Sequence, residues 1–145
     1  MMNISFTIDQ EAGIDPHEPL GNITISDGNS RLSIESTYLD SWFDVLIDGL
    51  NGLKTQNKLT LEILEEPEVI TFENLLSHFK ITYRKQELFF SNLKEFHQAL
   101  LISTKEFLSQ LQPNVKNLGN FPILNKINHF LEESTIKEKE GMLLL

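Results

Sequence analysis

Two groups of carboxylates have a residue type and spacing that could serve catalysis or binding. Three aspartates recur at every fourth position of one stretch, and three glutamates surround a proline in another: Asp40, Asp44, Asp48, Glu65, Glu66 and Glu68. Neighbouring carboxylates can serve as acid and base, but catalysis usually places them in a cleft that perturbs their pKa values. A proline turn is expected to leave its glutamates in solvent. The glutamates on the turn therefore resemble a contact surface more than an active site. The aspartate row is typical of an ordinary solvated polar face, and the alternative is an anionic surface for a basic partner.

The four histidines are the other candidates for catalysis or metal binding. His17 lies beside Glu18 in an acidic loop, but the spacing matches neither a calcium-binding loop nor a zinc motif, and the chain has no cysteine. His97 falls on the apolar face of a predicted helix, where a histidine is usually hydrogen-bonded within the core or at its edge. His78 and His129 have no acidic residue at a telling spacing. We therefore expect no metal, no cofactor and no catalytic residue.

Composition and motifs narrow the class of protein further. The 145 residues, 40% hydrophobic and 23% charged, predict one folded domain spanning residues 1–145. No nucleophile elbow, zinc-protease motif, phosphate loop or dinucleotide fingerprint occurs, so an enzyme or a small-ligand-binding domain is the least favoured class. The N-terminus lacks a basic region and the chain lacks a run of about 18 apolar residues. We expect neither a signal peptide nor a membrane span, and a cytoplasmic location.

The charge is unevenly distributed along the chain. The net charge is −9, and residues 1–73 carry 14 acidic and 3 basic residues, whereas residues 74–145 carry 7 and 9. An acidic half disfavours binding to nucleic acid or to an anionic membrane, because both require a cationic surface. It suits a basic protein partner. The alternative is that the acidity only supports solubility.

The stretch 37–54, TYLDSWFDVLIDGLNGLK, predicts the clearest amphipathic helix of the chain. Its apolar face holds Leu39, Trp42, Phe43, Leu46, Leu50 and Leu53, and the three aspartates lie opposite. Thr37 and Asp40 resemble a capping box, which gives Asp40 a local role. Asp48 lies near the C-terminal end, where the helix dipole disfavours an anion. Because it has no such local role, Asp48 is the first candidate of the row for contact with a partner.

Alternating apolar residues predict six strands, and longer periodic stretches predict two further helices. The strands are expected near residues 3–8, 21–26, 31–35, 58–64, 68–73 and 79–84, and the helices at 91–112 and 121–133. The Asp27-Gly28 pair indicates a hairpin, and the pattern leaves a seventh strand at 87–90 undecided. One-sided alternation predicts an α+β fold of two layers: an antiparallel sheet of about six strands, with two long helices and a C-terminal helix packed on one face. The apolar tail Met142–Leu145 could cover the core, extend an edge or form a homodimer.

The order of these segments resembles that of small bacterial immunity proteins. The resemblance covers about residues 20–112 and is carried by YLDSWFDVLIDGLNGL, LEILEEPEVITFE, FKITYR and EFHQALLISTKEFLSQL. Immunity proteins of this kind neutralise the toxin domains of contact-dependent growth inhibition and other polymorphic toxin systems. It is a resemblance of pattern and size without a diagnostic motif, so no functional residue of the family is transferred to this chain.

The resemblance implies a protein partner, a cognate toxin domain, and it agrees with the charge. A toxin that cleaves nucleic acid needs a cationic groove, which an acidic immunity protein can occupy by imitating phosphate. The expected partner is therefore a basic toxin domain, met by Asp40, Asp44, Asp48 and the turn Glu65–Glu68. The main alternative is a secretion-effector chaperone, since such chaperones are also small acidic α+β proteins that bind extended segments. Chaperones of that kind usually begin with a helix, whereas this chain is expected to begin with a strand.

Overall fold

A computed structural model describes residues 2–11, 18–112 and 122–143 of the chain. Its elements are, in order, β1 (Asn3–Ile8), β2 (Leu20–Ser26), β3 (Arg31–Tyr38), α1 (Leu39–Gly52), β4 (Lys58–Glu62), β5 (Val69–Asn74), β6 (Phe79–Tyr83), β7 (Gln86–Phe90), α2 (Leu93–Leu111) and α3 (Pro122–Leu143). The α+β class is confirmed. The single sheet of about six strands is wrong, because seven antiparallel strands divide into the sheets β1-β2-β3 and β4-β5-β6-β7.

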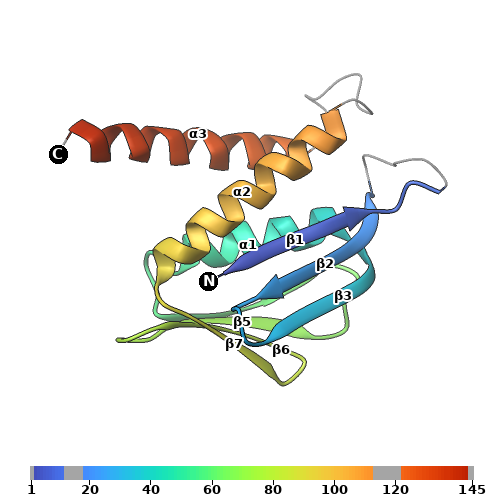
Figure 1. Ribbon diagram of the computed structural model, residues 1–145, viewed down its shortest axis with the longest axis horizontal. Coiled ribbons are helices and arrows are strands. Elements are labelled where there is room, and N and C mark those ends of the chain that lie inside the picture. The colour runs from blue at the N-terminus through green and yellow to red at the C-terminus, as the bar shows by residue number, and fades with distance from the viewer. Residues whose placement is uncertain (1, 12–17, 113–121, 144–145) are drawn as a thin grey trace.

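The two sheets approach each other where β3 lies near β7. The Gln86 amide of β7 donates to the backbone oxygen of Arg31 at the start of β3, and the Asp27 carboxylate accepts a 3.0 Å hydrogen bond from the Phe89 backbone. α2 crosses above β1, α1 runs behind it, and α3 lies outermost (Figure 1). β1 and β4 are therefore the outer strands of the arrangement.

α1 provides much of the core, as its periodicity predicts. The six predicted apolar residues are all buried, and Ile47, at the margin of the face, is also only 1% exposed. The helix begins at Leu39, two residues later than expected, because Thr37 and Tyr38 complete β3. The N-terminus of α1 has no side-chain cap, so the predicted capping box of Thr37 and Asp40 is wrong.

Two glycines near the end of α1 permit close packing against the four-stranded sheet. A Cβ atom on Gly49 would lie 2.5 Å from the ring of Phe72 in β5, and one on Gly52 would lie 2.4 Å from a methyl group of Leu59 in β4. Such distances are far below van der Waals contact. Glycine lowers the intrinsic helix propensity at both positions, but it allows α1 to pack closely against β4 and β5.

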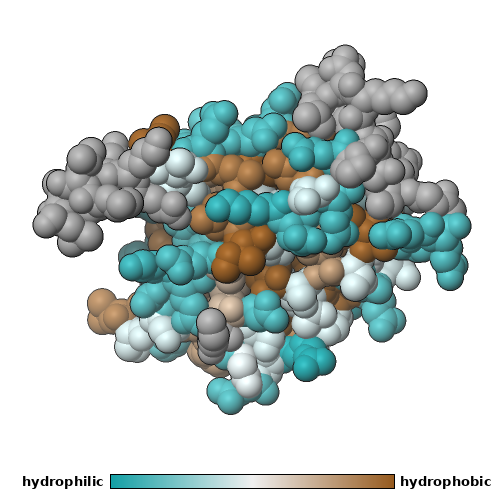
Figure 2. All heavy atoms as spheres, turned by 45° about the horizontal axis from the view of Figure 1, so that its top comes forward, coloured by the Kyte–Doolittle hydropathy of each residue, from teal (hydrophilic) through white to brown (hydrophobic). Residues whose placement is uncertain are grey.

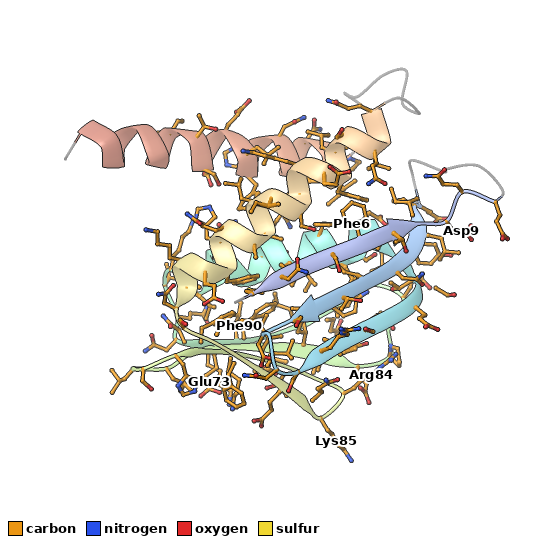
Figure 3. All side chains as sticks on the ribbon, viewed as in Figure 1. Phe6, Asp9, Glu73, Arg84, Lys85 and Phe90 are labelled. Carbon is orange, nitrogen blue, oxygen red and sulfur yellow. The ribbon has the colours of Figure 1, made fainter. Side chains whose placement is uncertain are left out.

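The seventh strand exists and is joined to β6 by a turn of two residues. Arg84 and Lys85 both have positive φ, at 51° and 63°, which is the geometry of a type I′ hairpin turn. Such a turn is usually filled by glycine, which has no Cβ, or by asparagine, whose short polar side chain tolerates positive φ. Arg84 and Lys85 lie at this hairpin tip, and Lys85 extends away from the sheet (Figure 3).

The remaining helices follow the sequence closely at their beginnings. The Asn92 side chain accepts from the backbone of Glu95 at 2.9 Å and caps α2. α3 continues well past the predicted end at residue 133, to Leu143. No helix in the described ranges is long and apolar enough to cross a membrane. Hydrophobic side chains gather in the middle of the face formed by the helices and β1, between hydrophilic ones (Figure 2).

Candidate functional site: an acidic groove beside α1

A groove of about 630 Å³ lies between the polar flank of α1 and the chain from the end of β4 to the start of β5. Five of the six predicted carboxylates line it: Asp44, Asp48, Glu65, Glu66 and Glu68. Its apolar lining comes from Val45 of α1 and from Leu61, Ile63, Leu64 and Val69. The sixth predicted residue, Asp40, lies in an adjoining hollow together with Asp44 and Lys126. The fold therefore brings two acidic segments, about twenty residues apart in sequence, to one place.

The aspartates of α1 are held by a lysine of α3. The Lys126 amine forms ion pairs with Asp44 and, at 2.6 Å, with Asp48. Partial burial opposes the charge of Lys126, but hydrogen bonds to both carboxylates outweigh it and hold the lysine pKa above its ordinary value. Asp48, for which the sequence indicates no local role in its own helix, helps to fix α3 against α1 through this long-range ion pair. About half of each aspartate side chain still faces solvent.

Glu66 is part of a buried network, so the prediction that the whole proline turn faces solvent is wrong. Its carboxylate accepts a 2.5 Å hydrogen bond from the hydroxyl of Thr37, and that hydroxyl accepts a 2.9 Å bond from the indole of Trp42. Tyr83 donates to the other carboxylate oxygen at 3.4 Å. Burial, with the charge of Glu66, raises the pKa of Tyr83 and keeps its proton in place. Glu66 thus ties the turn to the β3–α1 junction.

Arg84 balances part of the charge at the same turn. It lies 3.5 Å from Glu66 and 3.9 Å from Glu68, and its guanidinium sits 5.2 Å from the ring centre of Tyr83. Both Arg84 and Glu68 are about half exposed, so their ion pair contributes little to stability.

Two carboxylates of the groove have no partner among the described residues. Glu65 was predicted, and its backbone adopts a positive φ of 70° that turns the chain after β4. Glu62, at the end of β4, was not predicted as a site residue. Its signal was present in the alternation of β4, because Leu59 and Leu61 face inward and Glu62 must then face outward. Both side chains are exposed and are free to contact a partner.

Asp40 is poorly accommodated as an ion. One carboxylate oxygen is buried without a hydrogen-bond partner in the described structure. Burial raises the pKa of this side chain above its ordinary value; nearby backbone hydrogen bonds oppose the rise, and the charges of Glu18 and Asp44 add to it. Asp40 therefore differs from the other carboxylates of the row, which lie further in solvent.

The groove has a clear excess of negative charge. Six carboxylates line it and two cations, Lys126 and Arg84, pair with them, which leaves a surplus of four negative charges. Low-dielectric walls concentrate such a field and attract basic ligands. The half-exposed aspartates and the unpaired Glu62 and Glu65 can each accept hydrogen bonds from lysine or arginine.

The described histidines have structural surroundings. His97 Nε2 lies 2.9 Å from the hydroxyl of Ser134, which itself donates to the backbone of Phe130, so the hydroxyl is not activated as a nucleophile. His97 thus joins α2 to α3, as predicted for a hydrogen-bonded residue at the core edge. His129 lies 3.0 Å from Glu133, four residues along α3, so the prediction that it has no acidic residue at a telling spacing is wrong. His17 lies outside the described residues.

No group of three or more metal-binding side chains is found in the parts of the chain that the structure describes. No protein family, curated protein or solved structure matches this chain.

Proposed function

We propose that this chain is an immunity protein whose acidic groove binds and neutralises a basic toxin domain. The observation that supports the proposal is the convergence of Asp44, Asp48 and the turn Glu65–Glu68 on one groove with a surplus of four negative charges. A nuclease toxin must present a cationic surface to its substrate. An acidic groove can occupy that surface and exclude the substrate.

The free carboxylates provide the specific contacts in this proposal. Glu62 and Glu65 have no partner among the described residues, so binding a lysine or arginine there breaks none of the ion pairs that the structure describes. Glu66 supports the groove instead, because its carboxylate is committed to Thr37 and Tyr83. Asp44 and Asp48 contribute to the negative electrostatic field of the groove. Their exposed oxygens can still bind a second cation beside Lys126.

The proposal is tested by rescue of growth. A toxin-like domain encoded beside this chain's gene would be the toxin candidate, and cells expressing it should survive when the chain is co-expressed. The double variant Glu62→Lys and Glu65→Lys removes the whole surplus of negative charge from the groove and should lose the rescue. A matched control is Glu106→Lys with Glu132→Lys, which changes the net charge equally at exposed positions of α2 and α3 away from the groove.

Equal rescue by the two double variants would contradict the assignment of the groove. Binding to the disordered end of a secreted effector, with no protection against any folded toxin domain, would instead support a secretion chaperone. If the toxin domain encoded beside this chain's gene is neither bound nor inhibited, the proposal itself is wrong.

A further inference from the structure

The acidic groove lies at one end of β4, an outer strand of the four-stranded sheet whose far edge is unpaired among the described residues. β4 is hydrogen-bonded to β5 on one side and to no other strand that the structure describes. The end of β4 and the residues after it line the groove, opposite α1. An exposed sheet edge offers a row of backbone donors and acceptors to any strand that reaches it.

The pairing register shows which peptide groups of β4 face this edge. Just before β4, the Asn74 backbone donates to the oxygen of Asn57 at 2.7 Å, which makes these two a hydrogen-bonded pair of the antiparallel ladder. Such pairs recur at every second residue, so Leu59 and Leu61 are the next residues bonded to β5. The peptide groups of the residues between them must point away from β5. These residues are Lys58, Thr60 and Glu62.

The other side of the same sheet shows what satisfies an outward-facing peptide group. In β7 the backbone of Phe89 points away from β6 and donates to the carboxylate of Asp27, which comes from the turn between β2 and β3. The β7 edge is thus capped by another part of the protein. No described residue provides a corresponding acceptor or donor for Thr60 or Glu62.

The side chains at the Glu62 end of this edge favour an incoming strand that is both apolar and basic. Leu59 and Leu61 are only half-buried, so further apolar side chains could pack beside them. Asp48 of α1 and the unpaired Glu62 and Glu65 line the same groove. Because side chains of a strand alternate in direction, a segment with a cation at every second residue places its charges on one side and its apolar groups on the other.

We propose that an extended basic segment of the partner adds to the edge of β4 as a fifth strand and lies along the acidic groove. This inference rests on the proposed function and specifies how the partner is held. Backbone hydrogen bonds to Thr60 and Glu62 give the segment its register. The surplus of negative charge selects lysine and arginine over acidic residues.

The test uses a nine-residue peptide of alternating arginine and valine and the complete protein. Two modified peptides carry N-methyl groups either on all arginine amides or on all valine amides, so both keep their charge. Strand addition presents only one of these two sets to β4. One methylated peptide should therefore bind at least about tenfold more weakly than the unmodified peptide, and the other should bind nearly as well. A peptide of alternating glutamate and valine should not bind.

Amide hydrogen exchange provides a readout that needs no variant. In the free protein the amides of Thr60 and Glu62 should exchange rapidly and that of Leu61 slowly, and the peptide should slow exchange at Thr60 and Glu62. The variant Thr60→Pro removes an outward donor without breaking the ladder to β5, because proline is tolerated at such edge positions. It should weaken peptide binding about tenfold relative to Thr60→Ala, which keeps the donor.

Three results would overturn the inference: equal binding by both methylated peptides, unchanged exchange at Thr60 in the complex, or no binding of the basic peptide. Each can be separated from failure of the proposed function. If a toxin domain is neutralised but Thr60 exchange is unchanged in that complex, only strand addition is wrong. If the peptide adds to β4 but no toxin domain is neutralised, the immunity proposal is wrong.

Discussion

Replacing Glu66 with alanine should destabilise the domain much more than replacing its neighbour Glu65. The 2.5 Å bond from Thr37 to the Glu66 carboxylate is charge-assisted and shielded, because the Glu66 side chain is only 12% exposed. Loss of such a bond costs about 1.5–3 kcal/mol. The long bond from Tyr83 and the half-exposed Arg84 add little. We expect a loss of about 2–3 kcal/mol.

Unfolding can be followed through the only tryptophan, Trp42, whose indole belongs to the same network. For a domain of this size the loss corresponds to a fall in Tm of roughly 6–12 °C. Glu65→Ala removes the same charge from the same turn and should change stability by less than about 0.5 kcal/mol. A double-mutant cycle of Glu66→Ala with Thr37→Val should show a coupling of about 1 kcal/mol or more.

The reasoning would be refuted by equal Tm values for Glu66→Ala and Glu65→Ala, or by strict additivity with Thr37→Val. Either result would mean that the carboxylate of Glu66 does not hold the turn against the β3–α1 junction. The groove would then lack the internal support that distinguishes Glu66 from the carboxylates proposed to meet the partner.

Two further predictions follow from the charged groups around α1. Asp40→Asn should raise Tm at pH 7 by a few degrees, under about 1 kcal/mol after solvent screening, because the raised pKa of Asp40 means that its ionised form is disfavoured in the folded state. The difference in stability between variant and parent should shrink as pH falls through that raised pKa. A variant less stable than the parent at pH 7 would contradict this prediction. Lys126→Met should lower stability by about 1 kcal/mol at neutral pH and speed association with the arginine–valine peptide at low salt, since it leaves Asp44 and Asp48 unpaired. The stability difference should persist below the ordinary lysine pKa of 10.5 and vanish as pH rises through the raised pKa of Lys126, which denaturation curves at several pH values can measure.

Periodic patterns in the sequence predicted the elements whose burial is one-sided. The apolar face of α1 and the alternation of the first six strands both depend on residues within a few positions of each other. The sequence does not mark the β6–β7 turn in this way, because Arg84 and Lys85 adopt positive φ without the usual glycine or asparagine. The seventh strand therefore stayed undecided.

The errors at the site have a common physical cause, which is pairing across long stretches of sequence. Lys126 meets Asp44 from 82 residues away, and Thr37 meets Glu66 from 29 residues away. Rules based on neighbouring residues assigned Thr37 a capping role and assigned Asp48 no local role. Such rules do not include the distant residue that each of them contacts in the fold. Grouping of the two acidic segments was expected from charge alone, and the fold supplies the groove that joins them.

Association kinetics test the central proposal most directly. Stopped-flow measurement of the toxin domain binding to this chain should show a fast, strongly salt-dependent association. The double variant Glu62→Lys with Glu65→Lys should slow it by about tenfold or more at low ionic strength and flatten the salt dependence, whereas Glu106→Lys with Glu132→Lys should have a much smaller effect. Equal association rates for the two double variants would contradict the proposal that the acidic groove captures the partner.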